Sequence, residues 1–330
     1  MFWQLMKARE RLMKLTFEQI KEITVGAVSI WEEENGVHFG KCTNAQIEAW
    51  RIVEAGLVNN AIPTTGVRFD FHTSSSFVKV CFNSFGKYEV KINGIFKKQY
   101  LFTRESENKE IIIQLDGENA ENHLVIVLPN HFEAGVVASF EIADGAYVRP
   151  HVFDRKILFV GDSITQGFNS IYNLSSYAYL ISDYLNADSV IQGIGGSCFS
   201  PSTVLETGYK PDIVFIAYGT NDFTFVGSLA KMEENAREYI TKLQALYAGA
   251  KFFLITPIWR MDEDKVREMG TFKEARACIK GVAEELSVEV IDGYDLIPQL
   301  PEFMADSIHP NDLGFSLYAL NVLKQLQGKI

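Results

Sequence analysis

Apolar and polar residues alternate in short runs over the first half of the chain. FVKVCFNS at 77–84 and KYEVKINGIF at 87–96 both alternate, and Asn93-Gly94 in the second run is a strong signal for a hairpin turn. Further apolar runs follow at short intervals: KEIIIQLDG at 109–117, NHLVIVLP at 122–129 and GVVASFEIADG at 135–145. Short strands at even spacing predict an antiparallel β-sandwich of a jelly-roll-like kind.

The pattern changes at Lys156. Helical patterns at 228–249 and 272–287 now lie between short, continuously apolar runs. Apolar strands that alternate with helices predict a parallel sheet with helices on both faces. The predicted strands are KILFVGD at 156–162, SVIQGIGG at 189–196, PDIVFIAYG at 211–219, AKFFLITPI at 250–258 and SVEVIDGY at 287–294.

These two patterns predict two domains. We expect the β-sandwich over residues 25–150 and the α/β domain over residues 151–330, with the boundary between Pro150 and Asp154. Residues 1–24 form an N-terminal extension in this prediction, with a short helix over 14–24.

Composition narrows the range of partners. The net charge of −11 argues against nucleic acid or an anionic membrane as the main partner, and the oligomeric state stays open. No apolar stretch approaches the roughly 20 residues of a membrane span. Charges interrupt the N-terminus before a signal-peptide run, so we expect a cytoplasmic protein. The four scattered cysteines and the lack of a Gly-rich phosphate loop followed by Lys predict no metal and no cofactor.

Polar or small residues follow the predicted parallel strands. Gly161-Asp162-Ser163 ends the first strand, Gly193 to Gly196 the second and Gly219-Thr220-Asn221-Asp222 the third. The sequence DSIHPNDLG at 306–314 comes later and carries Asp306 three residues before His309. Because ligands bind at the carboxyl ends of strands in an open α/β sheet, these groups are expected to converge.

Taken singly, these residues have simpler explanations. Ser163 alone is better explained as a helix cap, and Asn221 as a turn former. The set favours acyl transfer, because His309 is the only histidine after residue 151 and such an enzyme needs one base. In that chemistry Ser163 attacks, His309 takes its proton and Asp306 orients the ring. The backbone N–H groups of Ser163 and Gly196 and the Asn221 amide are candidate oxyanion donors.

This constellation resembles the SGNH hydrolase family, also called GDSL-type esterases and lipases. Its four blocks match Gly-Asp-Ser-Ile-Thr at 161–165, Gly196, Gly-Thr-Asn-Asp at 219–222 and Asp-Ser-Ile-His at 306–309. The resemblance implies a flavodoxin-like three-layer α/β/α domain over roughly 152–330. It also implies the roles just named for Ser163, Asp306, His309, Gly196 and Asn221. One departure is Gln192-Gly193, where many members carry Asn before this glycine block.

A β-sandwich before such a domain is similar to the second carbohydrate esterase family, which deacetylates xylan and related sugars. The layout implies a short-chain esterase, acting on acetyl groups of a sugar through an acyl-enzyme. Trp259 either stacks on a sugar or packs against a helix, and Asp162 is a second candidate for substrate contact. Two alternatives stay open: a general lipase or acyltransferase acting on other alcohols, and a carbohydrate-binding protein without catalysis.

The remaining histidines belong to the sandwich or the junction. Those at 38, 72, 123 and 131 are expected on strands or turns, where they do no chemistry. His151 stands at the domain junction, where the linker could bring it near the cleft.

Overall fold

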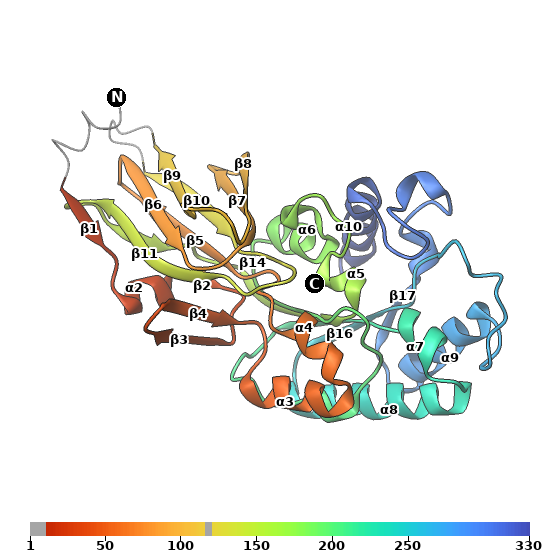
Figure 1. Ribbon diagram of the computed structural model, residues 1–330. Coiled ribbons are helices and arrows are strands. Elements are labelled where there is room, and N and C mark those ends of the chain that lie inside the picture. The colour runs from red at the N-terminus through yellow and green to blue at the C-terminus, as the bar shows by residue number, and fades with distance from the viewer. Residues whose placement is uncertain (1–10, 116–120) are drawn as a thin grey trace.

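The computed structural model describes residues 11–115 and 121–330. Two antiparallel sheets precede one parallel sheet flanked by helices, which confirms the predicted fold class (Figure 1). Residues 1–10 of the expected extension, and Asp116-Gly117 at the end of one expected strand run, lie outside the described residues.

The sandwich consists of two antiparallel sheets whose inner faces share one apolar core. In the first sheet, β1 (Leu12–Lys14) pairs with β11, and the path runs β3 (Ser29–Glu33), β4 (Gly36–Gly40), β11 (Val136–Ala143), β6 (Phe77–Phe82), β9 (Glu110–Gln114). In the second sheet, β2 (Thr24–Val25) pairs with β5, and the path runs β12 (Val148–Pro150), β5 (Arg68–Thr73), β10 (Asn122–Val127), β7 (Gly86–Ile92), β8 (Ile95–Phe102).

The segment before residue 25 is built into this sandwich. Helix α2 (Phe17–Glu22) begins at Thr16, whose side chain accepts from the Gln19 backbone N–H in a capping box. The helix is shorter than the expected 14–24 because β1 occupies its start and pairs with β11. Buried Ile20 packs into the sandwich core, so this segment contributes to the core of the first domain.

A helical insertion between β4 and β5 was not expected from the sequence. It contains α3 (Asn44–Val53), a 3₁₀ turn at Ala55–Leu57, and α4 (Val58–Ala61). Its apolar residues Trp50 and Leu57 form a small buried cluster with Ile194 of the α/β domain. The first domain therefore contacts the second close to one of its glycine-rich strand ends.

The parallel sheet has the order β14 (Ala187–Gly193), β13 (Arg155–Gly161), β15 (Ile213–Ala217), β16 (Lys251–Ile255), β17 (Glu289–Ile291). Side chains alternate across it, as strand geometry requires. Ile157 and Phe159 face α6 (Tyr177–Tyr184) and α10 (Asp312–Leu326). Leu158 and Val160 face α8 (Leu229–Leu246) and α9 (Phe272–Glu285). The result is the predicted three-layer α/β/α arrangement (Figure 1).

Among the described residues, none of the helices combines the length and apolar character needed to cross a membrane.

Candidate active site

The carboxyl ends of β14, β13 and β15 lie side by side. Gly161 is in register with Gly193 on one side and with Ala217 on the other. The chain then turns into the short helix α5 (Ser163–Gln166), which packs directly against β14. A Cβ at Gly193 would lie 2.2 Å from the Gln166 backbone nitrogen, so only glycine permits this contact. The close approach of helix and strand fixes the direction in which Ser163 leaves the sheet.

Ser163, His309 and Asp306 form one continuous hydrogen-bonded chain. Ser163 Oγ lies 2.8 Å from His309 Nε2, and His309 Nδ1 lies 2.8 Å from Asp306 Oδ2. A carboxylate only accepts, so Nδ1 donates its hydrogen to Asp306 and Nε2 presents a lone pair to the Ser163 hydroxyl. Ser163 is 7% exposed, which leaves the hydroxyl within reach of a ligand but largely shielded from water.

The Asp306 carboxylate is held by four hydrogen bonds. Oδ1 accepts from the backbone N–H groups of Ile308 and His309, both at 2.7 Å. Oδ2 accepts from His309 and also from Asn169 Nδ2 at 2.6 Å. Partial burial alone would raise the pKa of Asp306, but the backbone donors and His309 outweigh it and hold that pKa below its usual value. The carboxylate therefore stays ionised under His309 at neutral pH.

Two residues beside this chain were not identified from the sequence. Phe168 lies against the His309 ring, with centroids 4.9 Å apart. Asn169 holds Asp306 from a backbone conformation with φ of 67°, which favours Asn among non-glycine residues. Both follow the matched block at 161–165 closely, but nothing in their spacing marks them.

The candidate oxyanion donors lie on the two neighbouring loops. Gly196 is exposed with φ of 84°, and its backbone N–H makes no hydrogen bond to other described residues. Asn221 stands in α7 (Thr220–Phe225), and its Nδ2 donates to the Ser197 carbonyl at 3.1 Å. Since an amide nitrogen carries two hydrogens, Asn221 keeps one for a ligand. The Asn221–Ser197 bond ties the two loops together.

Two buried carboxyl groups lie beneath these loops. Asp162 is 2% exposed, and its Oδ1 accepts from Ile164 N at 2.9 Å as the cap of α5. This placement makes Asp162 a structural residue and leaves it no surface for the substrate contact considered above. Asp222 Oδ1 accepts from Phe199 N at 3.1 Å, while its Oδ2 is buried without a partner among the described residues. Burial raises the pKa of each carboxyl to about 7.

Trp259 lies in the loop after β16 and is half-buried. Its indole N–H donates to Glu263 Oε1 at 3.1 Å, and its ring packs against the apolar core under α6 and α10. The same loop reaches the histidine loop, where Met261 N donates to Ser307 O at 2.8 Å. The packing accounts for the half-buried ring, and a sugar contact stays a proposal.

Three histidines of the sandwich and the junction lie close together near the amino end of β14, at the opposite end of that strand from the candidate active site. His72 Nε2 and His151 Nδ1 lie 3.0 Å apart, and His151 Nε2 lies 2.7 Å from Asn186 Oδ1, just before β14 begins. His123 stacks on both rings, 4.6 and 4.5 Å between centroids and 11° from parallel. His72, His123 and His151 each place a ring nitrogen within 4.8 Å of the other two, a spacing at which three histidines could hold a metal ion. The linker keeps His151 away from Ser163.

The other two sandwich histidines differ from one another. His38 lies on β4, as expected. His131 lies in the loop after β10, where its Nε2 meets the Gly167 carbonyl at 3.3 Å and its ring meets Phe168 at 5.6 Å. Burial lowers the pKa of His131 to about 4, which keeps it neutral beside the site.

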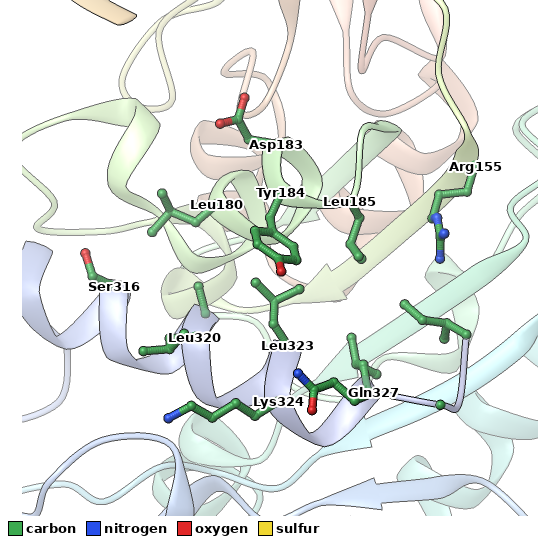
Figure 2. Close-up of a pocket in the computed structure, with 14 residues that line it drawn as sticks. Arg155, Leu180, Asp183, Tyr184, Leu185, Ser316, Leu320, Leu323, Lys324 and Gln327 are labelled. Atoms are coloured by element: carbon green, nitrogen blue, oxygen red, sulfur yellow. The ribbon is translucent and has the colours of Figure 1, made fainter. Parts of the chain in front are cut away.

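A separate groove of about 510 Å³ lies between α6 and α10 (Figure 2). Leu180 and Tyr184 line it from α6, and Leu320 and Leu323 line it from α10. Ser163, His309 and Asp306 are not among its lining residues, so we do not assign the groove to the substrate.

Several solved structures share this two-domain fold. A salicylyl-acyltransferase from a tetracycline biosynthetic pathway has a TM-score of 0.79 at 16% identity, over 97% of each chain. A family two carbohydrate esterase from Cellvibrio japonicus has a TM-score of 0.68 at 16% identity, over 96% of this chain and 97% of the other. An acetyl xylan esterase from the rumen bacterium Butyrivibrio proteoclasticus has a TM-score of 0.67 at 13% identity, over 97% and 98%.

No curated protein matches the chain in sequence. The family of GDSL-like lipases and acylhydrolases does match, over residues 159–317. This region starts within β13, includes Ser163, Gly196, Asn221 and His309, and ends within α10. Residues 159–317, within the α/β domain, are therefore similar to the GDSL-like lipase/acylhydrolase family.

Proposed function

We propose that this protein is a serine esterase that hydrolyses short acyl esters, foremost acetyl esters of a carbohydrate, through an acyl-enzyme. The observation that carries the proposal is the unbroken hydrogen-bonded chain from Ser163 through His309 to Asp306. A serine hydroxyl becomes a useful nucleophile only when a neighbouring base takes its proton, and His309 Nε2 is in place to do so.

In the first half of the reaction, Ser163 Oγ attacks the ester carbonyl as its proton moves to His309 Nε2. The imidazolium that forms is stabilised by the Asp306 carboxylate, which four hydrogen bonds keep ionised. The tetrahedral oxyanion accepts hydrogen bonds from the Gly196 and Ser163 amides and from the second Asn221 hydrogen. His309 then gives its proton to the departing alcohol oxygen, and the acyl group stays on Ser163.

In the second half, water replaces the alcohol. His309 takes a proton from this water as it attacks the acyl carbonyl, and the same donors hold the second oxyanion. Collapse of the intermediate returns the proton to Ser163 Oγ and releases the carboxylic acid. No group outside the described site is required to balance either step.

Two observations support the acyl and alcohol parts that we propose for the substrate. Structural relatives over the whole chain include an acetyl xylan esterase and family two carbohydrate esterases, although their low identity establishes the fold alone. The aromatic ring of Trp259, on a loop bonded to the histidine loop, offers a surface for a sugar ring.

A panel of p-nitrophenyl esters from acetate to octanoate tests this function. A buried methylene contributes ~0.8 kcal/mol, so a lipolytic pocket should gain about fourfold in kcat/KM for each added carbon. We expect the reverse, with kcat/KM highest at acetate and falling beyond butyrate. Ser163→Ala should be inactive throughout, and the exposed Ser202→Ala should match wild type. A series rising to octanoate would reject the acetyl-ester proposal while leaving Ser163 in its role.

Acyl transfer to an alcohol is the second candidate. It is favoured by the similarity to the salicylyl-acyltransferase, which extends over 97% of both chains. The same residues would serve, with an acceptor hydroxyl in place of water. Product analysis with and without a sugar or aryl alcohol acceptor separates the two, since a transferase forms the new ester at the expense of free acid.

A further inference from the structure

The loop that carries Gly196 is held by side chains from both domains. Gly195 O accepts from Asn60 Nδ2 of the sandwich insertion at 2.9 Å, and Gly195 N donates to Gln166 Oε1 of α5, also at 2.9 Å. Both polar backbone groups of Gly195 are thus used. The next amide, that of Gly196, makes no hydrogen bond to other described residues and is free to bind a ligand.

Lys41 holds the start of the same loop. It is fully buried, and its Nζ donates to Gly193 O, Asn60 O and Thr65 Oγ1, each at 2.8 Å. The Thr65 hydroxyl gives its own hydrogen to Asn130 O at 2.9 Å, so it must accept from Lys41. Three acceptors around one nitrogen match an ammonium group.

The charge on Lys41 is costly. Burial lowers the pKa of Lys41 to about 7, and the described residues offer it no carboxylate partner. A buried cation without a counter-ion destabilises a fold unless hydrogen bonds satisfy it fully. A residue needed only to fill this space would be apolar, so the three bonds point to a requirement for holding the backbone at Gly193.

A third contact ties the same segments. Gln192 Nε2 donates to Lys41 O at 2.8 Å and to Gln46 Oε1 at 3.1 Å. Gln192 is the residue at which the sequence departs from many family members. Its side-chain amide is hydrogen-bonded to Lys41 and Gln46 of the first domain. The residue at which this sequence differs from many family members therefore contributes to the contact between the two domains.

We propose that Lys41 and Asn60 are positioning residues of the esterase: they fix the segment from Gly193 to Gly196 so that the Gly196 amide faces the oxyanion. The inference rests on the function proposed above. It gives the sandwich domain a part in the rate of the reaction, through the loop, without any contact of its own with the reacting atoms.

The test compares Asn60→Ala and Lys41→Met with Asn59→Ala, a neighbouring, exposed asparagine on the same helix α4. Each variant is assayed on p-nitrophenyl acetate, and active sites are counted by the end point of fluorophosphonate labelling. Losing an oxyanion donor outright costs ~10²–10³ in rate, so a displaced donor should cost about 10- to 100-fold in kcat per labelled site. KM should stay within about twofold of wild type, and Asn59→Ala should match wild type.

Two results would overturn the proposal. One is an unchanged kcat per labelled site in Asn60→Ala, with only fewer sites or a lower melting temperature, which would show a purely structural role. The other is a raised KM at unchanged kcat, which would show a substrate contact instead. Asn60→Ala carries the test by itself if Lys41→Met does not fold. Failure of the esterase function looks different, because wild type would then show no labelling at Ser163.

Discussion

Asp306 shows how single atoms set the chemistry of this site. Its Oδ2 accepts from His309 Nδ1, and its Oδ1 accepts two backbone N–H groups from its own loop. The loop thus orients the carboxylate, and the carboxylate orients the imidazole. The orientation of the His309 ring and the negative charge beside it therefore both depend on Asp306.

Asp306→Asn should keep the fold and lose most of the activity. The Asn amide has nearly the same shape as the Asp carboxylate but carries no negative charge. One of the two carboxylate oxygens becomes an NH2 group, which cannot accept the hydrogen of His309 Nδ1 and so does not fix the same tautomer of the ring. In a serine protease the corresponding change costs ~10⁴ in kcat. We expect a loss of several orders of magnitude on p-nitrophenyl acetate, with the exposed Asp295→Asn as an unaffected control. A loss below tenfold would show that another acceptor orients His309.

Asp222 gives a prediction about stability and pH. Burial raises the pKa of its carboxyl to about 7, well above that of an unfolded chain. Between about pH 4 and pH 7 the folded state holds a proton that the unfolded state has released, so stability falls as pH rises through this window. Asp222→Asn cannot ionise and should lack this loss.

The measurement is the melting temperature of both proteins from pH 5 to pH 8. The difference, Asp222→Asn minus wild type, should grow toward higher pH. A difference that is constant over this range, or that shrinks, would contradict the pKa shift of Asp222.

At the scale of elements, the contact between α5 and β14 decides where Ser163 stands. That contact requires glycine at 193, because a Cβ there would lie 2.2 Å from Gln166 N and 2.6 Å from its Cα. Gly281 in α9 is the opposite case, because a Cβ there would meet no atom within 4 Å beyond the backbone of its own helix. The two glycines form a matched pair.

Gly193→Ala should destabilise the protein by at least ~1–3 kcal/mol, as overpacking does. Gly281→Ala should stabilise it by about 0.5–1 kcal/mol, because alanine is the better helix former. Urea titration of both variants measures the two changes in the free energy of unfolding. Equal effects would show that the α5–β14 contact relaxes freely.

Strands and long helices were predictable from the sequence because each buries a periodic face. The runs at 77–84 and 211–219 became β6 and β15, and the pattern at 272–287 became α9. The insertion at 44–61 was not predicted, since its buried residues face a different domain and form no long periodic stripe. The β-strand at Leu12–Lys14 was missed because three residues carry little pattern.

At the scale of the whole molecule, the four sequence motifs predicted a set of residues that the fold brings together. Ser163 and His309 are 146 positions apart and form a hydrogen bond, because the loop before α10 brings His309 to the end of β13, where Ser163 begins α5. The cross-domain contacts were not predictable in the same way. Lys41 and Gly193 are 152 positions apart, and no spacing rule links a sandwich lysine to a glycine loop. The expected domain limits at 25, 150 and 330 stay predictions.

The central claim is that Ser163 is the nucleophile activated by His309. Reaction with a fluorophosphonate, followed by peptide mass spectrometry, tests it most directly. We expect one adduct per chain, on Ser163, with labelling abolished in Ser163→Ala and slowed strongly in His309→Ala, since no other histidine lies in the α/β domain after residue 151. An adduct on a different serine, or undiminished ester hydrolysis by Ser163→Ala, would contradict the account.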